Sequence, residues 1–298
     1  MDTSALRDWF ADNQRDLPWR NPATSPWQIL VSEVMLQQTP VARVLPAWTA
    51  WCARWPTAAD LAQASLGEVL AQWNKLGYPR RAKNLYSCAT EVTSRFDGTL
   101  PADVETLESL PGIGAYTARA VACFAYGQAV PVVDTNVKRV VARAKDGDAA
   151  AGHWSTGFGL QHVDEVCQGL DDEAYCQTQK ALMELGALVC TARAPRCEEC
   201  PLVRDCRWRA LGYPENPEVQ PRKQARYEGS DRQVRGIILG WLRDHPGILD
   251  SETLEALWPK PAQRRRALQS LLDDGLVERV GDDSEECFSL SWQPGPGE

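Results

Sequence analysis

Four cysteines lie close together in the chain with the spacing C-x6-C-x2-C-x5-C, at Cys190, Cys197, Cys200 and Cys206. Four thiolates from one short segment can converge tetrahedrally on a [4Fe-4S] cluster or on one zinc ion, because both favour sulfur ligands. Ordinary reduced thiols are the weaker interpretation, since the other cysteines show no such pattern. Zinc sites usually pair two short C-x2-C knuckles, and this segment has one. The spacing favours a cluster and leaves zinc as the alternative.

Two acidic residues stand in contexts that suit acid–base chemistry. Glu33 lies in the strongly apolar helical segment PWQILVSEVML, whose surroundings would raise a carboxyl pKa as a general acid requires, although an exposed helix face is the plain alternative. Asp134 ends an apolar run and begins a helix, so it can cap that helix and stay ionised beside a cationic transition state. Gln37 and Gln38 follow Glu33 and offer amides for base edges or for a gap in a base stack.

A tight turn, Leu-Pro-Gly-Ile-Gly, joins two apolar helices within residues 107–127. In this turn Gly112 and Gly114, on either side of Ile113, permit a phosphate to approach the backbone closely. The second helix would direct its N-terminal N–H groups at that anion. Such turns are often only structural, but this one resembles the helix-hairpin-helix of DNA-repair proteins. We therefore predict that residues 112–114 contact DNA.

The elements that must position these residues are helices. Residues 1–210 read as short helices separated by Pro and Gly, and the one that carries Glu33 begins with Ser25 as N-cap and Gln28 as its capping-box partner. The predicted helices span residues 26–38, 40–54, 65–74, 79–95, 103–110, 115–126, 135–145, 160–169 and 173–188.

A second, smaller domain is predicted at the C-terminal end. Residues 211–230 are rich in Pro and polar residues and read as a linker. Residues 231–298 show three helical segments and then a hairpin around Gly281–Asp283, which is the order of a winged helix. Three arginines, residues 264–266, begin the third helix and could enter a DNA groove. A domain for protein contacts or for structure alone is an equal alternative.

Composition narrows the class of protein. The 298 residues, 44% of them hydrophobic, can bury a sizeable core, and neither a secretion leader nor an apolar membrane span is evident. We therefore expect a cytoplasmic protein with reduced cysteines. The net charge of −8 looks unfavourable for DNA binding, but two basic runs stand out. They comprise Lys75, Arg80, Arg81 and Lys83, and Lys138, Arg139, Arg143 and Lys145, and such runs are usually solvated helix faces.

Several motifs together resemble the helix-hairpin-helix DNA glycosylase superfamily that includes endonuclease III, and more closely the A/G-specific adenine DNA glycosylases of the MutY family. The resemblance covers residues 5–210. It is carried by RDLPWR at 15–20, SEVMLQQT at 32–39, LGY at 76–78, LPGIGAYTA at 110–118, VDTNVKRV at 133–140 and MELGALVC at 183–190, together with the cysteine loop. It implies a mainly α fold of two helical subdomains with a [4Fe-4S] cluster, followed here by a small winged-helix-like α+β domain.

The resemblance also implies a reaction. The enzyme would bind double-stranded DNA as a monomer, flip out an adenine mispaired with 8-oxoguanine or guanine, and hydrolyse its N-glycosidic bond. Glu33 would protonate N7 of the base, and Asp134 would stabilise the oxocarbenium-like sugar. Tyr116 stands where bifunctional relatives carry a Schiff-base lysine, so we expect a monofunctional enzyme that leaves an abasic site.

Further site residues follow from the resemblance. It places Arg15, Leu17, Trp19 and Glu184 in the base pocket, Asn136 in support of Asp134, and Gln38 and Tyr78 in the duplex as intercalating probes. The cluster would hold a rigid loop, with Arg193, Arg196, Arg204 and Arg207 nearby, against the DNA backbone.

The sequence departs from the family at its C-terminus, where relatives typically carry a β-rich, Nudix-like domain that inspects 8-oxoguanine. A plain A:G mismatch could therefore be accepted relatively well. Pro79 and Thr135 replace a frequent tyrosine and a frequent glycine, and neither removes a catalytic group. Two rival functions stay open: a thymine glycosylase for T:G mismatches and a non-catalytic iron–sulfur DNA-binding protein. Retention of both Glu33 and Asp134 argues against the second.

Overall fold

The computed structural model describes residues 1–215, 226–245, 247–280 and 286–291, and the chain divides into two compact, mainly helical units. The first unit comprises Met1–Ile29, Ala102–Glu108 and Ile113–Arg222, and the second comprises Leu30–Pro101, Ser109–Gly112 and Lys223–Glu298. Each unit is therefore assembled from separate stretches of sequence. Much of the predicted linker and the predicted hairpin turn at Gly281–Asp283 lie outside the described residues.

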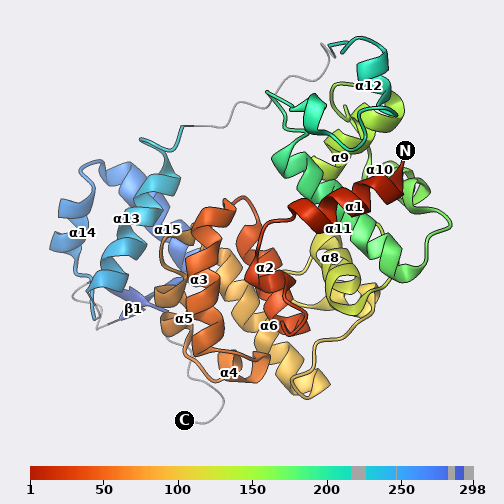
Figure 1. Ribbon diagram of the computed structural model, residues 1–298. Coiled ribbons are helices and arrows are strands. Elements are labelled where there is room, and N and C mark those ends of the chain that lie inside the picture. Colours follow the sequence, from red (N-terminus) through yellow and green to blue (C-terminus); the bar gives the residue numbers. More distant parts are fainter. Residues whose placement is uncertain (216–225, 246, 281–285, 292–298) are drawn as a thin grey trace. The chain divides into compact units, whose positions relative to one another are not determined.

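Figure 1 shows the elements in chain order. The helices and short helical turns are α1 (Thr3–Asn13), η1 (Pro18–Arg20), α2 (Pro26–Leu36), α3 (Val41–Arg54), α4 (Ala58–Ala62), α5 (Leu66–Trp73), η2 (Asn74–Leu76), α6 (Arg80–Phe96), α7 (Val104–Ser109), α8 (Ala115–Tyr126), α9 (Thr135–Val141), the π-helical η3 (Ala142–Asp146), α10 (Thr156–Cys167), α11 (Asp172–Leu188), η4 (Cys197–Glu199), α12 (Arg207–Ala210), α13 (Asp231–Asp244), α14 (Ser251–Leu257) and α15 (Pro261–Asp273). The strands are β1 (Val277–Val280) and β2 (Cys287–Leu290). None of the helices in the described part of the chain is long and apolar enough to span a membrane.

The core of the first unit is formed by α1, α9 and α11. One buried cluster joins the three helices. Five of its members have no exposed surface: Leu6 of α1, Val137 and Val141 of α9, and Leu182 and Leu185 of α11. Because these apolar residues recur at helical spacing, each helix presents one face to the cluster and its other face to polar surroundings. This packing sets the positions of Asp134, at the start of α9, and Glu184, on α11.

The core of the second unit is rich in tryptophan. Trp51 of α3 lies with its ring centroid 4.8 Å from that of Trp55 and 5.5 Å from that of Trp73, in edge-to-face arrangements. Such pairs add to the stabilisation from burial alone. Leu85 lies on the buried face of α6, which packs against α4 and α5.

Most predicted helices are present, and the local signals explain why. Ser25 Oγ accepts from the N–H of Gln28 at 3.3 Å while Gln28 Oε1 accepts from the N–H of Ser25 at 3.2 Å, which confirms the predicted capping box. The prediction missed α1, α4 and α12, and it joined α9 to η3 as one helix. The helix predicted over residues 160–169 spans Thr156–Cys167 and is capped by Ser155.

The C-terminal elements have the predicted winged-helix order. Helices α13, α14 and α15 are followed by the antiparallel pair β1–β2, with Val277 opposite Leu290, and Leu249 adds an isolated bridge to Phe288. The role proposed for residues 264–266 in a DNA groove stays a prediction for the exposed Arg265, whereas Arg264 and Arg266 have partners within the domain. Arg264 is buried and pairs with Glu255 at 2.7 Å, and Arg266 pairs with Asp231 at 3.1 Å, so these two guanidiniums serve the domain's own packing.

Candidate functional site

The four clustered cysteines line one small cavity at the end of α11. Cys190 follows α11, Cys197 begins η4, and Cys206 is the N-cap of α12, and all four cysteines lie along the cavity wall. Among the described residues, no group of His, Cys, Asp or Glu side chains is arranged to hold a single metal ion. The same four thiols are the ligand set that a [4Fe-4S] cluster requires.

Arg143 supplies positive charge beside these sulfurs. Its side chain is 4% exposed and donates to the carbonyl oxygens of Ala149 (2.9 Å) and Thr191 (2.8 Å) and to Cys190 Sγ (3.4 Å). It also stacks on the Trp208 ring at 4.4 Å. A buried guanidinium without a carboxylate partner would normally be unfavourable. It fits a site whose ligands are thiolates, and we conclude that these residues fit a [4Fe-4S] cluster.

Replacing Cys200 with serine is expected to prevent assembly of the cluster, because one of four sulfur ligands is lost. Purified protein should then lack the brown colour and the broad absorbance at roughly 400 nm of iron–sulfur clusters. Serine at the partly exposed Cys52, in α3, serves as the matched control and should leave the spectrum unchanged. An iron content at the wild-type level in Cys200→Ser would contradict this assignment.

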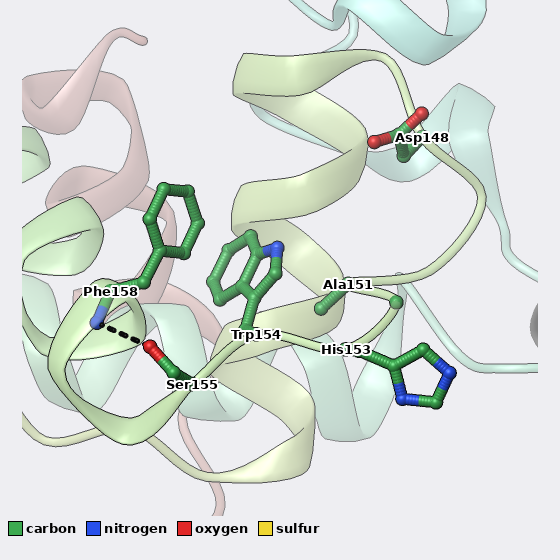
Figure 2. Close-up of a pocket in the computed structure, with 7 residues that line it drawn as sticks. Asp148, Ala151, His153, Trp154, Ser155 and Phe158 are labelled. Atoms are coloured by element: carbon green, nitrogen blue, oxygen red, sulfur yellow. Dashed lines mark hydrogen bonds between the residues drawn. The ribbon is translucent and has the colours of Figure 1, made fainter.

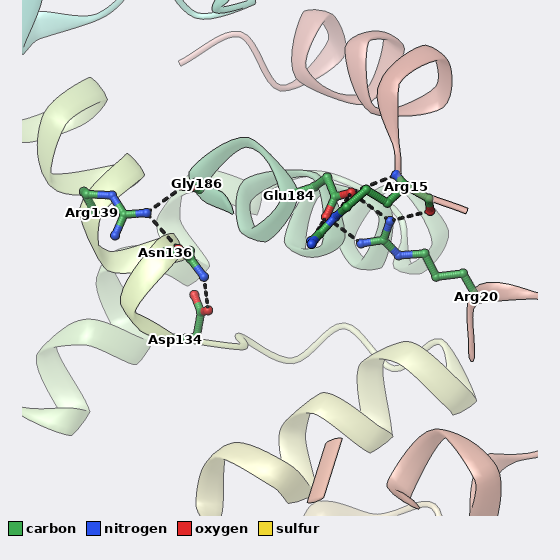
Figure 3. A network of polar contacts seen from close by, with 7 residues as sticks. All are labelled: Arg15, Arg20, Asp134, Asn136, Arg139, Glu184 and Gly186. Atoms are coloured by element: carbon green, nitrogen blue, oxygen red, sulfur yellow. Dashed lines mark hydrogen bonds and ion pairs between the residues drawn. The ribbon is translucent and has the colours of Figure 1, made fainter. Parts of the chain in front are cut away.

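Asp134 is held by hydrogen bonds to both of its carboxylate oxygens, and Figure 3 shows the one from Asn136. Oδ1 accepts from the N–H of Val137 at 2.7 Å, as predicted for an N-cap, and Oδ2 accepts from Asn136 Nδ2 at 2.8 Å. Burial raises the pKa of Asp134 above its ordinary value, while these two hydrogen bonds and the charge of Arg139 oppose the rise. The site therefore orients the Asp134 carboxylate, and its hydrogen bonds offset only part of the effect of burial on its pKa.

Arg139 connects Asp134 to the cysteine loop. Its Nη2 donates to Asn136 Oδ1 and to the Gly186 carbonyl, both at 2.7 Å (Figure 3). Its Nε donates to the Cys190 carbonyl, also at 2.7 Å. Gly186 is necessary here, because a Cβ at this position would lie 2.6 Å from Asn136 Cβ. Arg139 thus positions the Asn136 side chain, and Arg139 is itself held by the Gly186 and Cys190 carbonyls.

Glu184 accepts hydrogen bonds from two arginines. It is fully buried and accepts from the backbone N–H, Nε and Nη2 of Arg15 and from Nη1 and Nη2 of Arg20, at 2.6–3.0 Å. Burial alone would raise its pKa, but the hydrogen bonds from Arg15 and Arg20 lower it to about 2. Two bidentate arginines therefore bind residues 15–20 to α11. Leu17 and Trp19, between them, are buried.

Glu33 lies in the second unit on α2, and its side chain is 8% exposed. Residues 29–35 are all buried, so the interpretation that places Glu33 on an exposed helix face is wrong. The carboxyl group of Glu33 is therefore held within a buried, mainly apolar helical segment.

Arg81 organises the loops that carry the two predicted duplex probes. Gln38 and Tyr78 both have left-handed backbones, with φ of 55° and 49°, which non-glycine residues adopt only when the surroundings impose it. The Arg81 guanidinium lies between the two loops and is 9% exposed. It donates at 2.8–3.2 Å to six oxygens, those of Val34, Met35, Gln37, Leu76 and Gly77 in the backbone and Thr39 Oγ1.

Substituting lysine for Arg81 is expected to destabilise the protein by about 3 kcal/mol, because one ammonium cannot reach six acceptors and several buried carbonyls would be left unsatisfied. Burial already lowers the pKa of Arg81 to about 10, so a buried lysine would also lose charge more readily. Urea unfolding at neutral pH would measure the loss. Arg80→Lys is the control, since the neighbouring Arg80 side chain is 71% exposed, and an equal effect of both substitutions would contradict the role of Arg81.

The helix-hairpin-helix turn and Tyr116 have clear structural settings. Gly112 has φ of +74°, and a Cβ there would lie 2.5 Å from Asn84 Cβ, so glycine is required. Gly114 is the N-cap of α8, and the side chain of Ile113 is buried. Tyr116, the second residue of α8, packs partly buried against Ala120 and its apolar cluster.

A surface hollow of about 460 Å³ also lies in the first unit, before and at the start of α10 (Figure 2). Its lining includes Trp154, His153 and Phe158, and Ser155 Oγ caps the helix by accepting from the Phe158 N–H at 3.2 Å. None of the residues predicted for the site lines this hollow.

The prediction that the basic runs are solvated helix faces is wrong for three of their arginines. Arg81 and Arg143 are buried and Arg139 is half-buried, and all three donate to backbone carbonyls. Sequence reasoning also left Arg20 without a role. Its only signal was its place in the block RDLPWR, because its partner Glu184 is 164 residues away.

Comparison with known proteins agrees with this geometry. Residues 31–151 match the HhH-GPD superfamily of base excision DNA repair proteins, and residues 190–206 match the iron–sulfur binding domain of endonuclease III. The solved structure of a thermostable thymine-DNA glycosylase aligns with a TM-score of 0.61 at 24% identity, over 70% of this chain and 95% of that one. A non-covalent endonuclease III–DNA complex aligns with a TM-score of 0.59, also at 24% identity, over 70% and 94%. At this identity both support the fold alone.

The fold and these matched regions define a base excision repair DNA glycosylase of the helix-hairpin-helix class, with a [4Fe-4S] cluster in the cysteine loop. The adenine DNA glycosylase of Mycolicibacterium smegmatis is 56% identical over 93% of this chain and 92% of its own length, and that of Mycobacterium tuberculosis is 53% identical over 94% and 91%. The human adenine DNA glycosylase is 42% identical over 69% of this chain and 39% of its own. The chain belongs to the adenine DNA glycosylase family. The expected cluster is confirmed, and the zinc alternative is wrong.

Proposed function

We propose that this glycosylase removes adenine mispaired with 8-oxoguanine or guanine from double-stranded DNA and leaves an abasic site. The observation that carries the proposal is the environment of Asp134, a carboxylate capped by backbone and amide N–H donors in a chain closely similar to adenine DNA glycosylases. Each donor bonds one carboxylate oxygen, so the two hydrogen bonds fix the orientation of this carboxylate.

In the proposed reaction the adenine is flipped out of the duplex, and Glu33, acting as general acid, delivers a proton to N7 of the base. The N-glycosidic bond electrons then move into the protonated adenine as it leaves. Asp134 stabilises the positive charge that develops on the sugar, and water adds to the anomeric carbon. Two carboxyl groups with different environments can thus serve as acid and as electrostatic stabiliser.

We propose positioning roles for several other site residues. Asn136 orients Asp134, while Arg15 and Glu184 hold residues 15–20, with Leu17 and Trp19, as one wall of the base pocket. Gln37, Gln38 and Tyr78 probe the duplex, and residues 112–114 contact its phosphates. Support comes from the hydrogen bonds that restrain the Asp134, Glu184 and Arg81 neighbourhoods.

Tyr116 gives the enzyme no amine at the position expected of a Schiff-base lysine, and we propose that strand cleavage does not accompany base removal. A phenol cannot form the imine that β-elimination needs. The abasic site should therefore survive until alkali or another enzyme cleaves it.

The test is a set of duplexes with adenine opposite 8-oxoguanine, adenine opposite guanine, or thymine opposite guanine, each treated with alkali after incubation. Strand breaks are expected with the two adenine substrates, only after alkali. Glu33→Gln should lower the single-turnover rate by about a thousand-fold, whereas Gln at the exposed Glu105, at the start of α7, should not change it. Cleavage of the thymine substrate alone would reject the adenine assignment in favour of the rival glycosylase.

A further inference from the structure

Two cysteines outside the iron–sulfur loop approach each other very closely. Cys123 of α8 and Cys176 of α11, 53 residues apart in sequence, have their Sγ atoms 2.7 Å apart. Unbonded carbon atoms pack at about 3.5–4.0 Å, and sulfur is larger than carbon. A disulfide bond is about 2.05 Å long. The two sulfurs are therefore closer to bonding distance than to ordinary packing distance.

The surroundings leave these thiols few other roles. Both belong to a buried apolar cluster with Ala120 and Val132, and they are 1% and 4% exposed. Neither belongs to a group of side chains that could hold a metal ion in the described part of the chain. The Cys176 thiol also donates to the Gln128 carbonyl, at 3.2 Å.

The two sulfurs are also chemically unequal. The hydrogen bond from Cys123 lowers the pKa of Cys176, and Lys180, one turn further along α11, lowers it as well, whereas burial opposes both. The hydrogen bond to Cys176, followed by burial, raises the pKa of Cys123. Cys176 is thus the more easily ionised partner, and the thiolate is the form that reacts with oxidants.

We propose that Cys123 and Cys176 form a redox pair that closes to a reversible disulfide when a hydroperoxide reaches the site. The Cys176 thiolate attacks the hydroperoxide, the O–O bond breaks, and the departing alkoxide or hydroxide takes up a proton, which leaves a sulfenic acid on Cys176. The Cys123 sulfur then attacks Cys176, the S–O bond breaks, and the released hydroxide leaves as water with the proton of Cys123. In total, two thiols and one hydroperoxide give a disulfide, an alcohol or water, and water.

The bond would bridge α8 and α11 and close a loop that contains Asp134 and Asn136. Closing a long loop restricts the unfolded chain, so the oxidised protein should unfold at a temperature higher by about 5 °C. This inference does not depend on the base that the enzyme removes, because it concerns only the two thiols and their oxidant.

The test uses the full-length, cluster-loaded protein with hydrogen peroxide under anaerobic conditions, while the cluster absorbance is monitored. After denaturation, free thiols are alkylated and the protein is digested for mass spectrometry. We expect the peptides that contain Cys123 and Cys176 to be linked, with the link removed by a dithiol reductant. Alkylation of both cysteines after treatment would overturn the proposal, as would a sulfinic acid on Cys176 without a link or a link to another cysteine.

Serine variants provide a second test of the proposed disulfide. Cys123→Ser and Cys176→Ser should each abolish the linked peptides and the rise in unfolding temperature. Cys88→Ser, at a fully buried cysteine of α6, should leave both unchanged. If a serine variant does not fold, the peptide map of the wild-type protein still decides the question.

Discussion

Asp134→Asn should lose base excision almost completely while the protein remains folded. Asparagine keeps the oxygen that accepts from the Val137 N–H, but it lacks the negative charge proposed to stabilise the sugar cation, so the single-turnover rate should fall by about a thousand-fold. The folded-state pKa of Asp134 lies above its ordinary value, which means that burial makes the ionised form unfavourable to the fold at neutral pH. Removing the charge offsets the lost hydrogen bond to Asn136, and stability should stay within about 1 kcal/mol of wild type.

The excision rate is measured by single-turnover assays with an adenine substrate. The stability is measured by urea unfolding. Asp134→Ala is the informative control, because it removes the helix cap as well as the charge and should lower the unfolding free energy by a further 1 kcal/mol or so, about the usual effect of losing an N-cap. Near-normal excision by Asp134→Asn would remove this carboxylate from the mechanism.

Glu184→Gln should strongly destabilise the first unit. The neutral amide would leave two guanidiniums, those of Arg15 and Arg20, without a compensating charge, and the unfolding free energy should fall by about 3 kcal/mol. Urea unfolding at neutral pH gives the value. Glu173→Gln, at an exposed position near the start of the same helix, is the matched control and should change stability by less than about 0.5 kcal/mol.

The pH dependence of stability provides a second measurement of the interaction of Glu184 with Arg15 and Arg20. The folded pKa of Glu184, about 2, is below the ordinary value of 4.5, so its contribution is fully present above pH 4.5 and is lost as the pH falls toward 2. Allowing for solvent around the partly exposed Arg15, this contribution is about 2 kcal/mol. The stability difference between wild type and Glu184→Gln should narrow over that interval. A constant difference would show that Glu184 acts through packing instead.

Local signals in the sequence predicted much of the fold. The capping box of Ser25 and Gln28, the N-cap at Asp134 and the glycine at position 112 each depend on residues within a few positions, and the structure contains all three features. The π-helical turn η3 after α9 was not predictable in this way, because no short-range signal marks it and the buried Arg143 within it bonds the distant Thr191 carbonyl.

The parts of the site that depend on distant residues were harder to predict. The resemblance could assign Glu184 to a base pocket. It could not predict the hydrogen bonds from Arg15 and Arg20, because these form only when α11 packs against the N-terminal segment. Glu33 could be interpreted as an exposed helical acid until the burial of its whole helical segment was known. The periodicity of a helix buried on all sides contains no information about which face carries the chemistry.

The use of Arg81, Arg139 and Arg143 as internal donors affects how this protein should respond to ionic strength. Cations that are already bonded to backbone carbonyls displace few counterions from a DNA duplex, and each displaced counterion steepens the fall of affinity with salt. A plot of log affinity against log salt should therefore have a shallower slope than the number of lysines and arginines in the two basic runs suggests. Engineered surface lysines, rather than changes to these three arginines, would be the way to steepen it.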